Sequence, residues 1–165
     1  MMKAYVSGIT ETLSRLYALP ENVGKRITPA VAKKAMALML DAARSKCPVA
    51  TKATLNTTPG LLKASLDIKM KRYPRQNAVA VVIGARTDIK DPISGEIPAN
   101  IIHLVEYGTA PHMIGKKEHP GAQAQPFLRP AFDESRYGVI MRFRGLLKER
   151  VDKAVKKLNK GTAKK

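Results

Sequence analysis

The 165-residue sequence contains no tryptophan, and aromatic residues make up only 5% of it. A hydrophobic core therefore has to rest on Leu, Ile, Val, Ala and Met. Cys47 is the single cysteine, so an internal disulfide is excluded, and this usage is typical of a reducing cytoplasm. At this length we expect one core domain.

Long apolar runs are absent as well. No segment has the roughly 20 apolar residues that span a bilayer. Thr10, Glu11 and Arg15 interrupt the stretch near the N-terminus that a secretory signal would need. We predict a protein with no membrane partner that stays in the cell that makes it, unless it leaves inside a particle.

Acidic residues are scarce: 13 Asp and Glu stand against 30 Lys and Arg, which gives a net charge of +17. This charge implies a polyanionic neighbour, either nucleic acid or an acidic protein surface. Because aromatic platforms for base reading are missing, any nucleic-acid contact should be non-specific. The simpler alternative is a solvated, lysine-rich helix face. The candidate DNA-facing residues are Lys69, Lys71, Arg72 and Arg75, and in the C-terminal segment Arg142, Arg144, Lys148, Lys153, Lys156 and Lys157.

Catalytic motifs are missing too. Neither a glycine-rich phosphate loop nor an H-E-x-x-H sequence occurs, so we predict no cofactor and no metal. His103 and Glu106 suggest a metal or acid–base site, but they would share a face only in a helix. The simpler interpretation is that Glu106 makes a structural hydrogen bond or an interface ion pair. His112 and His119 are interpreted as polar loop residues. Cys47 has no located histidine that could activate it, and we predict that the protein is not an enzyme.

Two helices are predicted in the first third of the chain. Ser7–Leu19 has apolar residues at helical spacing and is followed by a polar linker. Thr28 is a suitable N-cap for a second helix, Pro29 occupies its favoured first position, and Pro48 limits its end. We predict that Pro29–Lys46 is the main core helix.

The middle of the chain is predicted to form a small sheet. Leu61–Lys71 alternates loosely between apolar and polar residues, which predicts a strand with one wet face. The branched residues of Ala78–Ala85 suit a mostly buried strand. We expect a hairpin that pairs Leu66–Lys71 with Val79–Gly84, followed by a surface flap over Thr87–Ala99.

The predicted fold class is α+β: one long core helix packed on a small antiparallel sheet, plus an N-terminal helix and a basic C-terminal helix. Asp133–Leu158 supplies the C-terminal helix, and the final NKGTAKK should be disordered. We divide the chain into an N-terminal helix and linker (1–27), a core α+β domain (28–137) and a basic C-terminal helix and tail (138–165).

The stretch Ile101–Phe132 organises the rest of the chain. It opens with an apolar segment, Ile101–Tyr107, that fits either a third strand or a short helix. A polar loop without predicted structure follows over 108–126, and an apolar cluster closes the stretch. A loop held by apolar residues at both ends is a common contact surface. We expect Phe127, Leu128 and Phe132 to fix the loop to the core helix.

The same stretch carries two linked motifs, VEYGTAPHM and QPFLRPAFDES. Together they resemble the signature of the tail-completion (neck) proteins of tailed bacteriophages, (F/Y)-(V/L)-E-(F/Y)-G-T … P-H … QPF-(L/M)-RPA. A further motif of that family, P-V-D-T-G-x-L-(R/K)-x-S, matches except that Ala50 replaces the Asp and residues are inserted between Thr51 and Gly60. The assembly residues that the resemblance implies are Glu106, Tyr107, Gly108, Thr109, Pro111, His112, Gln125, Pro126, Phe127, Leu128, Arg129 and Pro130.

The resemblance implies a virion structural protein of the head–tail junction. It would be made in the host cytoplasm and would form one subunit of a homo-oligomeric ring in the neck. The ring would join the portal-side connector to the tail proteins, and genomic DNA would pass through its lumen by non-specific contact.

Two other functions compete with this expectation. The first is a non-specific nucleic-acid-binding accessory protein that acts through its basic tail, and it predicts that truncation after Tyr137 abolishes activity. The second is a small hydrolase, which predicts that alanine variants of His103 and Glu106 fold normally but lose turnover.

Overall fold

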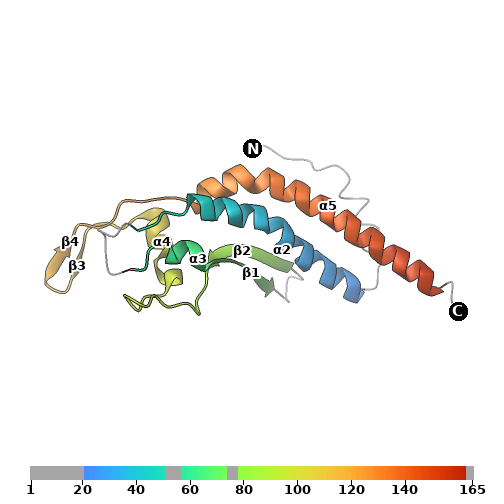
Figure 1. The fold of residues 1–165 in the computed structure, drawn as a ribbon, viewed down its shortest axis with the longest axis horizontal. Coiled ribbons are helices and arrows are strands. Elements are labelled where there is room, and N and C mark those ends of the chain that lie inside the picture. The colour runs from blue at the N-terminus through green and yellow to red at the C-terminus, as the bar shows by residue number, and fades with distance from the viewer. Residues whose placement is uncertain (1–20, 51–56, 74–77, 163–165) are drawn as a thin grey trace.

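The computed structural model describes residues 21–50, 57–73 and 78–162 (Figure 1). Its elements are α2 (Glu21–Lys46), α3 (Leu61–Ser65), β1 (Leu66–Tyr73), β2 (Ala78–Ala85), α4 (Pro98–Tyr107), β3 (His112–Ile114), β4 (Lys117–His119) and α5 (Leu128–Thr162). The predicted α+β class is confirmed. The predicted N-terminal helix, Ser7–Leu19, lies outside the described residues.

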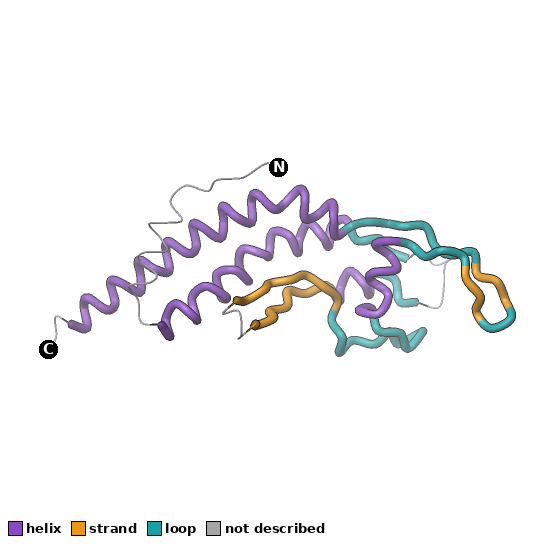
Figure 2. The backbone as a smooth tube through the Cα atoms, turned by 180° about the vertical axis from the view of Figure 1, so that it is seen from behind, coloured by secondary structure: helices purple, strands orange, loops and turns teal. Residues whose placement is uncertain are grey.

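Three layers form the body of the molecule. Helix α5 runs antiparallel along one side of α2, and the β1–β2 hairpin covers the other side (Figures 1 and 2). The hairpin is antiparallel, with Leu66 opposite Ala85 at one end and Tyr73 opposite Ala78 at the other. Both the predicted hairpin and the packing of the core helix on a small sheet are therefore confirmed.

Helices α2 and α5 meet along rows of residues four positions apart. The buried row on α2 consists of Val31, Ala35, Met39 and Ala43, and Cys47, just after the helix ends, continues it. On α5, positions 131, 135, 139, 143, 147, 151 and 155 are buried or half-buried. Rows at this spacing are the ridges that interdigitate in the commonest class of helix packing. The alanines in both rows let the two backbones approach closely.

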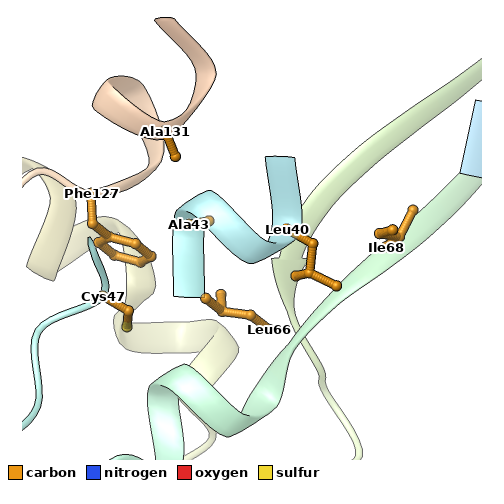
Figure 3. Packing of buried hydrophobic residues seen from close by; sticks show 7 residues of the cluster. All are labelled: Leu40, Ala43, Cys47, Leu66, Ile68, Phe127 and Ala131. Carbon is orange, nitrogen blue, oxygen red and sulfur yellow. The ribbon is translucent and has the colours of Figure 1, made fainter. Parts of the chain in front are cut away.

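The main hydrophobic cluster lies where α2 meets the sheet and the first turn of α5 (Figure 3). Its buried members are Leu40, Ala43, Cys47, Leu66, Ile68, Phe127 and Ala131. Among the residues whose burial the structure describes, Phe127 is the largest side chain that is fully buried. A second, smaller cluster packs Val31 of α2 against Leu147 and Val151 of α5.

The core helix begins earlier than predicted. Helix α2 starts at Glu21, so Thr28 lies within it and Pro29 is an interior proline. An interior proline removes one helical hydrogen bond and costs about 3 kcal/mol. Here Ile27 packs against the cluster that Val31 forms with Leu147 and Val151 of α5, and this burial stabilises the turn beside the proline. Capping signals are local and could not reveal that long-range contact. The boundary proposed at 27/28 thus falls inside α2, and the one at 137/138 falls inside α5.

The central segment also departs from its predicted pattern. Leu61–Ser65 forms the short helix α3, and strand β1 begins only at Leu66. Strand β2 has the predicted bounds but is not mostly buried, since Val79 is 41% and Val82 47% exposed. The reason is that the sheet has two strands and α2 covers one face only. The open choice at Ile101–Tyr107 resolves as helix α4.

The C-terminal helix is longer than predicted at both ends. Helix α5 begins at Leu128 rather than Asp133 and continues to Thr162. The predicted disorder of the final segment is therefore wrong for Asn159–Thr162. Within the described residues no helix combines the length and apolar character that crossing a membrane requires.

Candidate assembly site

The two sequence motifs of the 101–132 stretch meet at the carboxylate of Glu106. This side chain, near the end of α4, is only 6% exposed. Its Oε2 accepts hydrogen bonds from the backbone N–H groups of Phe127 (2.8 Å) and Leu128 (2.9 Å), and its Oε1 accepts one from Arg129 (2.9 Å). A helix cannot satisfy these first N–H groups by itself. Pro130, which follows, has no N–H, so one carboxylate accepts from every backbone N–H of the Phe-Leu-Arg-Pro sequence.

Glu106 therefore acts as the N-terminal cap of α5, from 21 to 23 positions away in sequence. Burial alone would raise the pKa of this carboxyl group. The hydrogen bonds from Leu128, Phe127 and Arg129, together with the charge of Arg129, outweigh burial and hold the pKa below its ordinary value. The predicted structural hydrogen bond of Glu106 is confirmed, and the carboxylate is ionised at neutral pH.

Residues 109–122 form a projection that we call the arm, and its base is closed by backbone hydrogen bonds. Thr109 N–H donates to Ala122 O (2.9 Å), and Ala122 N–H donates back to Thr109 O (3.1 Å) and Oγ1 (2.8 Å). Just beyond the arm, Gln125 N–H donates to Val105 O (2.8 Å) and so ties the returning chain to α4.

Two glycines make this close approach possible. Gly108 has φ +71°, and a Cβ atom there would lie 2.6 Å from Ala122 O. Gly121 has φ +85°, and its Cβ would lie 2.2 Å from Thr109 O. Both positions require a left-handed backbone and leave no space for a side chain. The Gly-Thr of the first motif is therefore explained by the geometry of the arm's base.

The arm itself is a β-hairpin, not the loop without structure that the sequence predicted. Strands β3 and β4 pair His112 with His119, Met113 with Glu118 and Ile114 with Lys117. All residues from 110 to 120 are exposed. The hairpin extends away from the body, at the end where α4 lies (Figures 1 and 2). Met113 and Ile114 are 62% and 58% exposed, although both are apolar.

The remaining predicted assembly residues divide into buried and exposed positions. Phe127 is fully buried, and Leu128 packs partly against the main cluster, as expected. The expectation for Phe132 is wrong, because this ring is 49% exposed. Since α5 begins at Leu128, it is Ala131, four positions after Phe127, that faces α2. Exposed members of the set are Tyr107, Pro111, His112, Gln125, Pro126, Arg129 and Pro130.

The candidate DNA-facing residues lie in two separate layers. Lys69, Lys71 and Arg72 belong to β1, and the second group belongs to α5, on the opposite side of α2 (Figure 1). Arg75 lies outside the described residues. Some of these cations have local partners: Lys69 Nζ donates to Ala85 O, and Lys153 pairs with Glu149. In α5, Arg144 is half-buried, and Arg142, Lys148, Lys156 and Lys157 are exposed.

The residues considered for catalysis are not gathered into one site. Burial raises the pKa of the Cys47 thiol to about 11, so this group is a protonated core residue at neutral pH. His103 is exposed on α4, while both Glu106 oxygens face backbone N–H groups. Within the described ranges there is no group of three or more His, Cys, Asp or Glu side chains placed to hold a metal ion.

Sequence reasoning missed the apolar tip of the arm. The sequence does contain a signal for a hairpin here, because the short segments HMI and KEH flank a turn at Gly115-Lys116. It also missed a groove at the base of the arm, lined by residues of four separate segments. Comparisons of this chain with protein-family models, with curated proteins and with solved structures found no match.

Proposed function

We propose that this chain is a structural subunit of the head–tail junction of a tailed bacteriophage. Copies of it would form a ring between the portal-side connector and the tail. The observation that carries the proposal is the coincidence of both resembling motifs with one structural unit. Glu106 caps α5 through the Phe-Leu-Arg sequence, and Gly108 and Thr109 close the base of an exposed arm.

The exposure of the arm supports an assembly role. An exposed projection of fourteen residues with apolar side chains at its tip contributes little to the stability of its own subunit, and such side chains commonly mark contact sites. A ring needs heterologous interfaces, in which one patch contacts a different patch of the next subunit. The arm and the flap of Thr87–Ala99 are the candidate patches.

The positive charge also fits a channel that carries DNA. Phosphate neutralisation by Lys and Arg would hold a passing duplex without reading its sequence. Because the two basic groups lie in opposite layers, a ring would turn only one of them towards its lumen. The exposed cations of α5 and those of β1 are therefore separate candidates for the DNA-facing surface.

The proposal is tested by imaging and native mass spectrometry of the purified protein, and by labelling of virions. We expect closed rings in solution and the label at the neck. The wild type is compared with a variant that lacks the arm. In this variant a short turn replaces residues 111–120, and Glu106 and the core are unchanged. This variant should fold but remain monomeric. A wild-type protein that stays monomeric at every concentration, and whose label is absent from the neck, would refute the proposal.

A second candidate function is non-specific nucleic-acid binding through α5. Its supporting observation is the exposure of Lys148, Lys156 and Lys157 on one long helix. Truncation after Tyr137 is not a suitable test, because it would remove Leu147 and Val151 from the core. Substitutions that neutralise these exposed lysines leave that core intact, so they test nucleic-acid binding without unfolding the protein.

A further inference from the structure

The structure contains an apolar groove beside the base of the arm. The groove has a volume of about 620 Å³ and lies between α3, α4, the segment after α2 and the loop that precedes α4. Its apolar lining includes Val49, Leu61, Ile101 and Leu104. A hollow of this size and composition is suited to receive one or two aliphatic side chains.

The groove has an acidic side. Asp91 and Glu96 both line it, and no basic residue does among the described positions. Asp91 is held in place because Thr58 donates to it from its N–H (2.9 Å) and its hydroxyl (2.7 Å). Glu96, in the same loop, is exposed. An occupant that combines apolar side chains with a positive charge would therefore match the groove.

The tip of the arm has this combination. Ile114 and Lys117 are a cross-strand pair, and such pairs place their side chains on one face of a hairpin. Met113 and Lys116 lie beside them in the chain. This face of the tip thus presents the Ile114 side chain next to the Lys117 ammonium group, while Met113 pairs with Glu118 on the opposite face, and the whole tip is exposed on its own subunit.

The arm does not occupy the groove of its own subunit. Ala122 and Gln125, where the arm leaves the body, line the groove. The hairpin then runs away from the body, and six residues of strand geometry separate Thr109 from Gly115, or roughly 20 Å. The Thr109–Ala122 bridge and the two glycines beside it fix this direction. The matching groove has to belong to another copy.

We propose that the tip of the arm docks in the groove of a neighbouring copy, with Ile114 against Leu104 and Lys117 near Glu96. This inference rests on the proposed ring, for which it supplies the subunit contact. Each copy both gives an arm and receives one, so the contact is heterologous and repeats from subunit to subunit until the ring closes.

Disulfide trapping between two different variants tests the contact. One variant is Ile114→Cys, and the other is Leu104→Cys with a tag of different mass. The native Cys47 can stay, because it is buried and its pKa is raised to about 11. On mixing and oxidation we expect the two-variant dimer to form at least about ten-fold faster than in a control pair of Ile114→Cys with Val82→Cys. Val82 is exposed on the sheet, outside the groove.

Each outcome is informative about both proposals. Closed rings without the Ile114–Leu104 cross-link overturn the arm-in-groove contact and leave the ring proposal standing. The cross-link in open chains or dimers supports the contact and counts against the ring. Absence of both rings and cross-link refutes both. In a further variant that carries both Ile114→Cys and Leu104→Cys, a disulfide within one chain would show that the arm reaches its own groove, and would overturn the inference.

A charge swap provides a second readout that does not depend on trapping. Lys117→Glu places a carboxylate opposite Glu96 and should weaken self-association by about ten-fold or more, since like charges across an interface are costly. Glu96→Lys should weaken it similarly, and the double variant should recover most of the loss. At concentrations too low for association, all three proteins should keep the thermal stability of the wild type, because both side chains are exposed on the subunit. If association is unchanged in every variant, another partner or a segment of the same chain occupies the groove and the inference is wrong.

Discussion

At the scale of single residues, Glu106 connects the two halves of the motif. It joins the end of α4 to the start of α5 through three backbone hydrogen bonds. Hydrogen bonds to a charged acceptor are each stronger than those between neutral groups. Phe127, whose own N–H is one of the donors, fills the centre of the core on the other side. Phe127 therefore donates its N–H to the capping carboxylate and also anchors the start of α5 through its buried ring.

We predict that Glu106→Gln lowers the free energy of unfolding by about 2–4 kcal/mol at pH 7, because charged acceptance by both oxygens is lost. The folded-state pKa lies below the unfolded one. The carboxylate thus stabilises the fold above the ordinary glutamate pKa of about 4.3, and this contribution is lost as the pH falls through the lowered value. Denaturant unfolding at pH 7 and near pH 3 should show the difference between the two proteins shrinking.

A suitable control for this variant is Glu134→Gln. Glu134 forms an exposed ion pair with Lys46 at 2.7 Å, and such pairs contribute about 1 kcal/mol or less. A Glu106 variant as stable as wild type would contradict the capping role. If that variant also lost a hydrolytic turnover, the hydrolase alternative would gain support instead.

The two phenylalanines of the QPFLRPAF segment should respond differently to truncation. Phe127→Ala leaves a cavity at a fully buried position and should cost about 3–5 kcal/mol. Phe132→Ala removes a ring that is 49% exposed and should cost less than about 1 kcal/mol. Chemical denaturation of both variants measures this contrast, and equal losses would show that the anchor is assigned to the wrong ring.

At the scale of elements, α5 is unusual because two of its three glycines, Gly138 and Gly145, lie deep inside a long helix, far from its ends. A Cβ added at Gly138 would lie 3.7 Å from Leu38 Cδ1, an ordinary contact, and one added at Gly145 would have nothing within 4 Å. Interior glycine weakens a helix because its backbone loses more entropy on folding than that of any other residue. Packing against α2 compensates for this along the helix, which explains why α5 continues through both positions.

We predict that Gly145→Ala raises the free energy of unfolding by about 0.5–1 kcal/mol, since it favours the helix and meets no steric obstacle. The matched control is Gly115→Ala at the tip of the arm, where φ is +62° and an alanine is strained. Thermal unfolding should show stabilisation by the first substitution and not by the second. Destabilisation by Gly145→Ala would mean that this surface of α5 contacts another subunit closely.

At the scale of the whole molecule, the net charge is +17, and the candidate DNA-facing cations of the described residues lie in two opposite layers, β1 and α5. Exposed cations screened by salt do not determine the fold, but they do determine attraction to polyanions. In a ring, the layer that faces the lumen would meet DNA, and the other layer would meet solvent or an acidic neighbour.

Two matched double variants should identify the DNA-facing layer: Lys156→Gln with Lys157→Gln in α5, and Lys71→Gln with Arg72→Gln in β1. All four side chains are exposed. Loss of two phosphate contacts should reduce the slope of log K against log salt by about 1.8. We expect one double variant to show this reduction and the other to bind duplex DNA like the wild type. No DNA binding by the wild type, even at low salt, would contradict a DNA-facing role.

The sequence by itself determined the features that depend on local pattern. Alternation and branched residues predicted the β1–β2 hairpin, and helix-forming residues before Pro48 located the end of α2. The same residues predicted the α+β class. These signals suffice because the period of two or of 3.6 is set by the backbone geometry of a strand or a helix, whatever lies around it.

Only the tertiary structure decided what depends on partners far along the chain. Pro29 lies inside a helix because the residues around it pack on α5, and Phe132 is exposed because α5 already begins at Leu128. The arm is a hairpin because Thr109 pairs with Ala122 at its base. Glu106, likewise, caps a helix that begins more than 20 positions later in the sequence. Contacts of this kind leave no periodic trace in the sequence, since their energy comes from groups that meet only once the chain has folded.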